Sequence, residues 1–258
     1  MERIVRDKLV YYRFDNWDML KHGVFTRLGG VSQSPWDTLN VGGTMGDNLE
    51  AVRQNHQLMY DAVGANQERA CTTWLVHSVD VVVVDSPVIG RKWQAIADGM
   101  ITNQPDTPLV MRYADCTPLL FFDRAKQVIG ISHAGWRGTV GGIASRTIHA
   151  LEHHYGCIAS DIEVGIGPCI GARRYQVGDE VVDAVVTYFG DTDGLICRDE
   201  RDGTAYFDLV AANKRDLERV GVEKIATSGI CTAENTQEFF SHRAEKGRTG
   251  RFGVVISL

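Results

Sequence analysis

The chain has 258 residues, of which 44% are hydrophobic and 23% charged, and this composition indicates a globular protein with a sizeable core rather than a disordered chain. Its formal net charge of −6 argues against a wide basic surface for nucleic acid or anionic lipid. The N-terminus lacks the apolar segment of a secretion signal and no apolar run approaches the length of a membrane span, so we expect a cytoplasmic protein.

Short apolar runs rich in β-branched residues predict strands, in chain order, at residues 22–26, 79–84, 108–113, 118–123, 127–132, 162–167, 224–230 and 252–257. Helical patterns with an acidic start and a glycine stop cover residues 47–64, 179–190 and 208–221, and Asp47 is the N-cap candidate of the first. A further helix is expected from about residue 139 to residue 155, ending at Gly156. These patterns predict an α/β fold with a mixed sheet covered by helices. No linker divides the sequence, so residues 1–258 are expected to form a single domain.

Three short motifs place metal-binding residue types at junctions between an apolar strand and a polar turn. They are WLVHSVD with His77, RYADCTPLL with Cys116, and SHAGWRG with His133. Two imidazoles and one thiolate are a suitable ligand set for zinc, which keeps a fourth position for water in catalytic sites. The spacing alone does not establish the site, because the residues come from separate strands. In the competing interpretation His77 caps a turn, Cys116 is a small buried hydrophobic residue, and His133 bonds a backbone carbonyl.

The segment after His133 adds a second reason to expect a ligand there. Gly135-Trp136-Arg137-Gly138 lies where a predicted strand ends and a helix is expected to begin. Exposed backbone amides and the helix dipole favour an anion at such a junction.

At the level of whole motifs, the sequence resembles the YfiH-type laccase-domain family, whose members are also described as multifunctional purine nucleoside phosphorylases. The resemblance rests on an ordered set of blocks: GVFTRLGGVSQSPWDTLNVG (23–42), ADGMIT (97–102), YADCTPLLFFD (113–123), HAGWRGTVGG (133–142), GIGPCIG (165–171), ICTAENTQEFFSHR (230–243) and GRTGR (247–251). It spans nearly the whole chain. One departure is Leu75-Val76-His77-Ser78, where the family usually has Gln-Val-His-Gly.

The resemblance implies a zinc site made by His77, Cys116 and His133, with copper as the alternative ion. It implies a layered α/β sandwich with a mixed β-sheet core, related to toxin deamidase folds. The implied reactions are phosphorolysis of adenosine, inosine and S-methyl-5′-thioadenosine to a ribose 1-phosphate and free base, and deamination of adenosine. The expected partners are therefore a purine nucleoside and phosphate, in a monomer or a homodimer.

Phosphorolysis requires cationic side chains that hold phosphate next to an oxocarbenium-like transition state. Arg27 and Arg137 are the main candidates because both lie beside glycine-rich turns, although a lone arginine more often pairs with a surface carboxylate. Arg243 and Asn40 complete the predicted substrate-binding set. Deamination also needs an acid for the departing ammonia, and Asp115 is the candidate, although an aspartate at a turn is more often a cap.

Three other classes of protein could use the same residues. In a thiol hydrolase that edits peptidoglycan precursors, Cys116 would be the nucleophile and His133 or His77 the general base. Copper-dependent oxidation of polyphenols is the second, but 8 histidines without a His-x-His pair argue against a multicopper centre. The third is a binding module without catalytic activity.

Overall fold

The structure, a computed structural model, describes residues 1–87 and 93–258 and is built around two large β-sheets. The first sheet is antiparallel and contains, in spatial order, β1 (Glu2–Arg6), β2 (Leu9–Arg13), β3 (Lys21–Phe25), β14 (Phe252–Ser257) and β6 (Leu109–Tyr113). The second is mixed and contains β13 (Lys224–Thr227), β9 (Glu163–Ile166), β7 (Thr117–Asp123), β8 (Val128–Ala134), β5 (Gly99–Thr102) and β4 (Val81–Val83). Its parallel pairs are β13 with β9 and β4 with β5.

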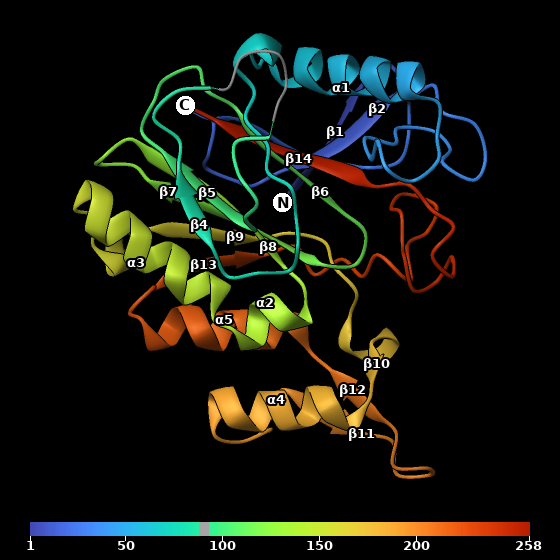
Figure 1. Cartoon of the computed structure of the whole chain (residues 1–258), viewed down its shortest axis with the longest axis vertical. Coiled ribbons are helices and arrows are strands. Elements are labelled where there is room, and N and C mark those ends of the chain that lie inside the picture. The colour runs from blue at the N-terminus through green and yellow to red at the C-terminus, as the bar shows by residue number, and fades with distance from the viewer. Residues whose placement is uncertain (88–92) are drawn as a thin grey trace.

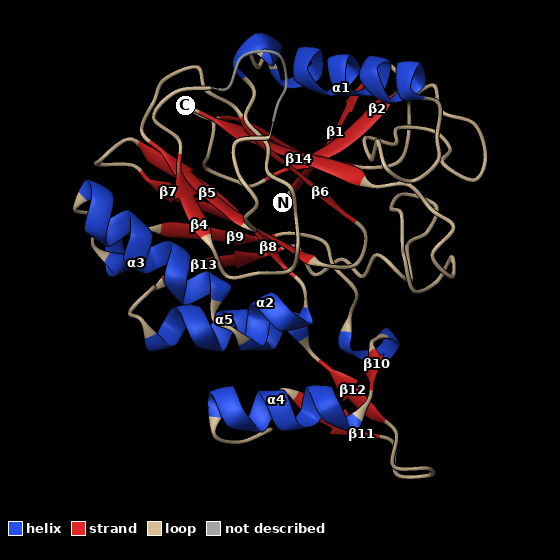
Figure 2. Ribbon diagram, viewed as in Figure 1, coloured by secondary structure: helices blue, strands red, loops and turns tan. Residues whose placement is uncertain are grey.

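Helices cover the outer faces of both sheets, so the layers follow the order helix, sheet, sheet, helix (Figure 1). Helix α1 (Leu49–Val63) covers the first sheet, and α3 (Ile143–Tyr155) and α5 (Leu209–Arg219) cover the second. The short α2 (Trp136–Val140) lies beside α5. At the bottom of Figure 2, α4 (Asp179–Phe189) packs on a small sheet formed by β10 (Gln176–Val177), β12 (Ala205–Phe207) and β11 (Ile196–Arg198).

The main core lies between the two large sheets. Every residue of β7, β8 and β14 is buried, because these strands have apolar layers on both faces. In β6 the two faces differ: Met111 and Tyr113 pack into the core between the sheets, while Val110 packs toward α1. This layered arrangement confirms the α/β sandwich with a mixed sheet that the sequence predicts.

The predicted helix over residues 139–155 is wrong at its start. The structure has two helices there, because Gly142 adopts a left-handed conformation with φ of 78° between them, while Gly156 ends α3 as predicted. The first predicted helix also begins later than expected, since the side chain of Asn48, not Asp47, accepts the backbone N–H groups of Glu50 and Ala51.

None of the helices in the described part of the chain combines the length and the apolar composition that crossing a bilayer requires.

Candidate functional site

The pairing of β7 with β8 brings Cys116 close to His133. Cys116 directly precedes β7, and the antiparallel register sets Pro118 opposite His133. His77 comes from the segment before β4 and has a left-handed backbone with φ of 60°. The potential ligand atoms of His77, Cys116 and His133 lie within 4.8 Å of one another, and Sγ of Cys116 is 3.8 Å from Nε2 of His77. The structure thus brings together the three residues that the sequence singles out.

Gly135 makes this approach sterically feasible. A Cβ atom at this position would lie 2.8 Å from Cδ2 of His77 and 3.0 Å from Sγ of Cys116. Any other residue would therefore push one of the two side chains away. Gly135, two residues after His133 in the sequence, keeps the space between the two side chains free.

Asp98 connects the His133 imidazole to the backbone on either side of His77. Its Oδ1 lies 2.9 Å from Nδ1 of His133, and its Oδ2 accepts hydrogen bonds from the backbone N–H groups of Val76 (3.1 Å) and Ser78 (2.7 Å) and from the hydroxyl of Ser78 (3.1 Å). A carboxylate accepts the Nδ1–H proton, so Nε2 of His133 is left to face a metal ion. The Ser78 hydroxyl is a donor that the usual glycine of the family could not supply.

Cys116 and His133 stabilise each other's charged form. Burial alone would raise the pKa of Cys116, but the charge of His133 and hydrogen bonds from both imidazoles outweigh it and lower the pKa to about 6. Burial alone would lower the pKa of His133, but the Cys116 thiolate and the Asp98 carboxylate raise the pKa to about 9. Hydrogen bonds from His133 and from the Ser78 and Val76 amides likewise outweigh burial and lower the pKa of Asp98. Cys116 is therefore in the thiolate form that binds metals.

The donor set and its geometry fit zinc. A tetrahedral ion at typical Zn–S and Zn–N distances holds its sulfur and nitrogen ligands roughly 3.5 Å apart, close to the 3.8 Å between Cys116 and His77. One thiolate and two imidazoles also suit a single copper ion. Within residues 1–87 and 93–258, no second group of three or more His, Cys, Asp or Glu side chains converges in this way. A centre with several copper ions has no further ligand group in the described residues.

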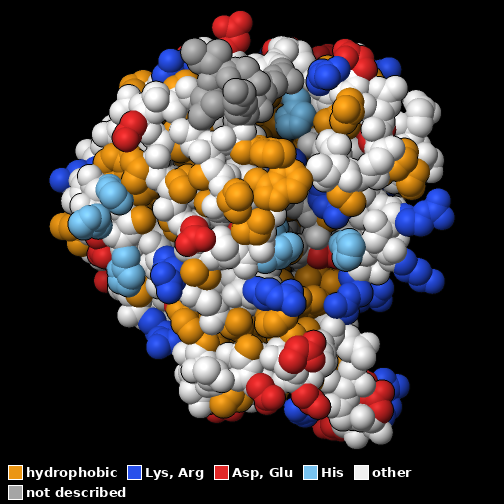
Figure 3. Space-filling view, viewed as in Figure 1, with side chains coloured by type: hydrophobic (Ala, Val, Ile, Leu, Met, Phe, Trp, Pro, Cys, Tyr) orange, Lys and Arg blue, Asp and Glu red, His pale blue; other side chains and the backbone are white. Residues whose placement is uncertain are grey.

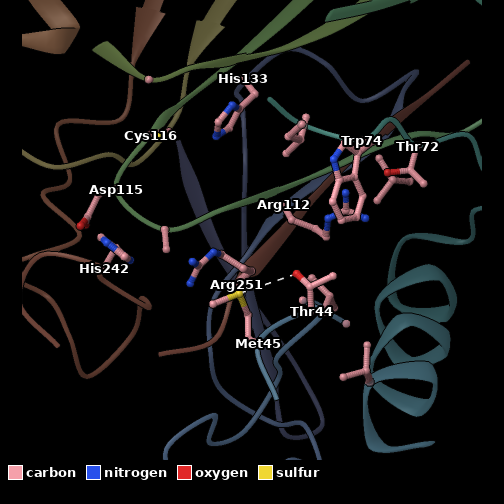
Figure 4. A pocket seen from close by; sticks show the side chains of 18 of the residues that line it. Thr44, Met45, Thr72, Trp74, Arg112, Asp115, Cys116, His133, His242 and Arg251 are labelled. Atoms are coloured by element: carbon pink, nitrogen blue, oxygen red, sulfur yellow. Dashed lines mark hydrogen bonds between the residues drawn. The ribbon is translucent and has the colours of Figure 1, made fainter. Parts of the chain in front are cut away.

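A cavity of about 780 Å³ opens beside these residues and is lined by several arginines. They are Arg53, Arg112, Arg137, Arg243 and Arg251. Arg53 pairs with Glu50 at 2.9 Å, whereas none of the other four pairs with a carboxylate among the described residues. Figure 4 shows Arg112 and Arg251 extending into the space between His133 and Met45. Burial lowers the pKa of both, yet guanidinium groups stay charged at neutral pH. The cavity is therefore cationic, even though the net charge of the chain is −6.

Two of the predicted substrate-binding residues do not line this cavity. Arg27 is 8% exposed, and its guanidinium donates to the backbone oxygens of Asp37 and Thr236 and to Oε1 of Glu245 at 2.9 Å. Asn40 is fully buried and holds the turn before α1, because its amide bonds Asp47 and the backbone of Gly42 and Arg251. Both side chains are committed to internal contacts, so we do not carry them into the substrate site.

The other predicted residues do reach the cavity. Arg137 lies 4.3 Å above the Trp136 ring, and Arg243 donates to the backbone oxygen of Gln176 at 2.8 Å. Asp115 also lines the cavity, but Thr232 donates to its Oδ1 at 2.7 Å and the backbone N–H of Arg243 to its Oδ2 at 2.7 Å. The Asp115 carboxylate thus holds the segment that carries Arg243.

Sequence reasoning did not identify Asp98, Arg112 or the tryptophans Trp74 and Trp93 at the cavity. Arg112 had a visible signal, because it interrupts an otherwise apolar strand. Asp98 lies inside the ADGMIT block, but nothing local links it to a histidine 35 residues away. The tryptophans are 36% and 51% exposed, and Figure 3 shows hydrophobic side chains gathered near the middle of the face drawn there.

Comparison with known proteins gives a consistent family. Residues 21–258, which include His77, Cys116 and His133, match the family described as multi-copper polyphenol oxidoreductase laccase. The chain is 34% identical over 242 residues to the purine nucleoside phosphorylase YlmD of Geobacillus stearothermophilus, covering 91% of this chain and 88% of the relative. It is 33% identical over 237 residues to the purine nucleoside phosphorylase YfiH of Escherichia coli, covering 90% and 91%.

Solved structures extend the similarity to the whole fold. The crystal structure of the Bacillus licheniformis hypothetical protein YfiH superposes with a TM-score of 0.92 at 27% identity, covering 98% of this chain and 97% of that one. The crystal structure of YlmD from Geobacillus stearothermophilus gives a TM-score of 0.90 at 30% identity with the same coverage.

Proposed function

The chain belongs to the multi-copper polyphenol oxidoreductase laccase family of YfiH-type proteins, and on that premise we propose that it is a zinc-dependent purine nucleoside phosphorylase. The proposed substrates are adenosine, inosine and S-methyl-5′-thioadenosine with inorganic phosphate, and adenosine deamination is proposed as a second activity of the same site. The names of the relatives support this reading. The observation that carries it is the convergence of His77, Cys116 and His133 on a cavity whose lining includes four arginines without carboxylate partners among the described residues.

Arg137 and Arg243 are the residues that bind phosphate in this proposal. In phosphorolysis phosphate approaches C1′ while the bond to the base breaks, so the site must hold an anion next to a developing positive charge. Arg137 is stacked on Trp136, and Arg243 is tied to Gln176, so both guanidinium groups are fixed before the substrate arrives. Fixed charges lose little entropy on binding and need little reorganisation in the transition state.

Neighbouring groups set the protonation of the proposed metal ligands. Asp98 fixes the proton of His133 on Nδ1, and the lowered pKa of Cys116 keeps its sulfur in the thiolate form at neutral pH. When bound, the ion supplies Lewis-acid chemistry beside the reacting atoms. Asp115 is given a positioning role, because both of its oxygens accept hydrogen bonds from the protein.

Product analysis tests the proposal directly. Zinc-loaded protein is incubated with inosine and phosphate, and ribose 1-phosphate and hypoxanthine are measured. A parallel incubation with adenosine and no phosphate detects inosine formed by deamination. The H133A variant should lose both products, since it lacks a metal ligand. Zinc-loaded protein that forms no ribose 1-phosphate from any of the three nucleosides would refute the phosphorylase proposal.

A thiol hydrolase is the second candidate, because Cys116, His133 and Asp98 form a chain of nucleophile, base and orienting carboxylate. Its reaction would not need a metal ion. Activity toward a peptidoglycan precursor that survives complete metal removal but is lost when Cys116 is alkylated would favour the hydrolase. Loss of nucleoside phosphorolysis on chelation, restored by added zinc, would favour the phosphorylase.

A further inference from the structure

Arg112 is a partly buried cation whose position in the cavity the metal centre does not explain. It shares with Val110 the face of β6 that is turned toward α1, and the strand register sets Gly253 opposite to it. Its Nη2 donates to the backbone oxygen of Thr73 at 2.9 Å, which fixes the guanidinium beside residues 72–74. Among the described residues it makes no further hydrogen bond and no ion pair, so most of its N–H donors have no protein acceptor. Arg112 lines the cavity, so a ligand with acceptor atoms could accept hydrogen bonds from these donors.

The residues beside Thr73 offer an aromatic surface and a second polar group. The indole rings of Trp74 and Trp93 lie 4.3 Å apart between centroids, and both line the cavity. The backbone N–H of Trp74 donates to the oxygen of Ala95 at 2.9 Å, which holds the two segments together. The hydroxyl of Thr72 is buried without a hydrogen-bond partner. Figure 4 shows Thr72, Trp74 and Arg112 on one side of the cavity, with Asp115 and His242 on the other.

We propose that Arg112, Trp74 and Thr72 form the base-recognition part of the cavity, and that they select 6-oxopurines over 6-aminopurines. This inference rests on the proposed function in taking a purine as the ligand. Exposed indole faces stack on any purine, so Trp74 supplies affinity without choosing between bases. Selection comes from Arg112, because a guanidinium donates hydrogen bonds and accepts none. The O6 and N7 atoms of hypoxanthine or guanine are both acceptors and match it, whereas adenine presents an amino group beside N7.

We therefore expect inosine and guanosine to bind more tightly than adenosine and S-methyl-5′-thioadenosine. The contact with Arg112 also orients the base. O6 points at Arg112, and the ribose is attached at the opposite end of the ring system. Adenosine deamination at the metal centre would require the base to turn, so that C6 faces the metal ligands. Phosphorolysis and deamination would thus use two orientations of the nucleoside.

The test is equilibrium binding of the free bases, followed by quenching of tryptophan fluorescence and by calorimetry, with the zinc-loaded protein and no phosphate. We expect hypoxanthine to bind about tenfold more tightly than adenine, the usual scale of a matched two-point contact. The R112Q variant offers one donor and one acceptor, which suits adenine, so the preference should vanish or reverse. R174Q, at an exposed arginine outside the cavity, is the matched control and should keep the wild-type ratio.

Several outcomes would overturn the inference. They are equal binding of the two bases, binding of neither, or an unchanged preference in R112Q. Weaker binding of inorganic phosphate to R112Q with an unchanged base ratio would make Arg112 part of the phosphate site instead. If R112Q does not fold, the W74A variant provides a second test, because it changes a partly exposed side chain. W74A should weaken the binding of both bases by the same factor. A changed ratio of the two affinities would contradict the proposal that Trp74 supplies affinity and Arg112 selectivity. Because the assay contains no phosphate and measures no product, its result is independent of whether phosphorolysis occurs.

Discussion

Nδ1 of His133 lies 2.9 Å from Oδ1 of Asp98, and the other oxygen of the same carboxylate accepts the backbone N–H groups of Val76 and Ser78 on either side of His77. One fully buried carboxylate therefore sets the ring orientation of one candidate histidine ligand and the backbone position of the other. The two histidines are 56 residues apart in the sequence, and Asp98 is the group that couples them.

The D98N variant tests this coupling. An amide cannot accept hydrogen bonds at both of its ends, so either the His133 ring or the His77 segment loses its partner. We expect zinc affinity to fall by about 10-fold to 100-fold, the range found for residues that orient metal ligands. Competition with a chromophoric chelator measures the affinity. D80N, at an exposed aspartate nearby, is the matched control, and equal zinc affinity of D98N and wild type would contradict the assigned role.

The sequence predicts the strands well where both faces of a strand are buried, as in β7 and β14, because their apolar runs are unbroken. It misses β1, an edge strand whose sequence ERIVR is mostly exposed and charged. The candidate metal ligands could be predicted from residue chemistry, because Cys and His at strand ends are unusual in themselves. The pairing of Arg27 could not be predicted, because a local pattern cannot show that Glu245 lies 2.9 Å away across the fold.

Two arginines of the cavity also show that local sequence patterns do not reveal contacts across the fold. Arg112 and Arg251 come from β6 and from the residue before β14, and the register that pairs Arg112 with Gly253 sets both on one face of the sheet. That register depends on a pairing between strands far apart in the sequence. Composition and motif spacing carry no information about it, so the contribution of Arg112 to the basic lining appears only in the folded chain.

Arg137 should contribute to phosphate binding more than to nucleoside binding. Removing its charge in R137M removes a charge-assisted contact to phosphate, so we expect KM for phosphate to rise about tenfold. KM for inosine should change by less than about twofold, since phosphate and base are held by different groups. Initial rates with each substrate varied in turn measure both constants. R174M, at an exposed arginine outside the cavity, should behave as wild type, and a larger effect on inosine than on phosphate would exclude this role.

Arg27 should act on stability. Its guanidinium bonds Glu245 at 2.9 Å and lies 4.5 Å from the Phe240 ring centre, so R27M leaves a largely buried carboxylate without its cation. We expect the free energy of unfolding to fall by about 3 kcal/mol, as for other buried pairs that lose one partner. Urea unfolding followed by circular dichroism measures it. R201M, which removes an exposed arginine from its pair with Asp199, should leave the free energy of unfolding nearly unchanged. If R27M is as stable as wild type but has a raised KM for phosphate, Arg27 binds substrate and its role is not structural.

His22 makes stability depend on pH at a position away from the cavity. It is 1% exposed, and its Nε2 accepts the backbone N–H of Phe14 at 2.9 Å, a bond that requires the neutral ring. Burial lowers the pKa of His22 from 6.5 to about 4, and the charge of Arg13 acts in the same direction. Between pH 6.5 and pH 4 the unfolded chain therefore binds a proton that the folded chain does not. The stabilising effect is complete above pH 6.5 and is lost as the pH falls toward 4.

The H22Q variant isolates this contribution. Linkage predicts that His22 alone makes wild type about 2 kcal/mol less stable at pH 5.0 than at pH 7.5. Because glutamine does not titrate, H22Q should lose about 2 kcal/mol less than wild type over the same interval, although it is less stable at pH 7.5. Urea unfolding of both proteins at the two pH values gives the difference, in which all other titrating groups cancel. H153Q, the same substitution at an exposed histidine of α3, should follow wild type. Parallel pH dependence in H22Q and wild type would mean that His22 is protonated equally in the folded and unfolded chains.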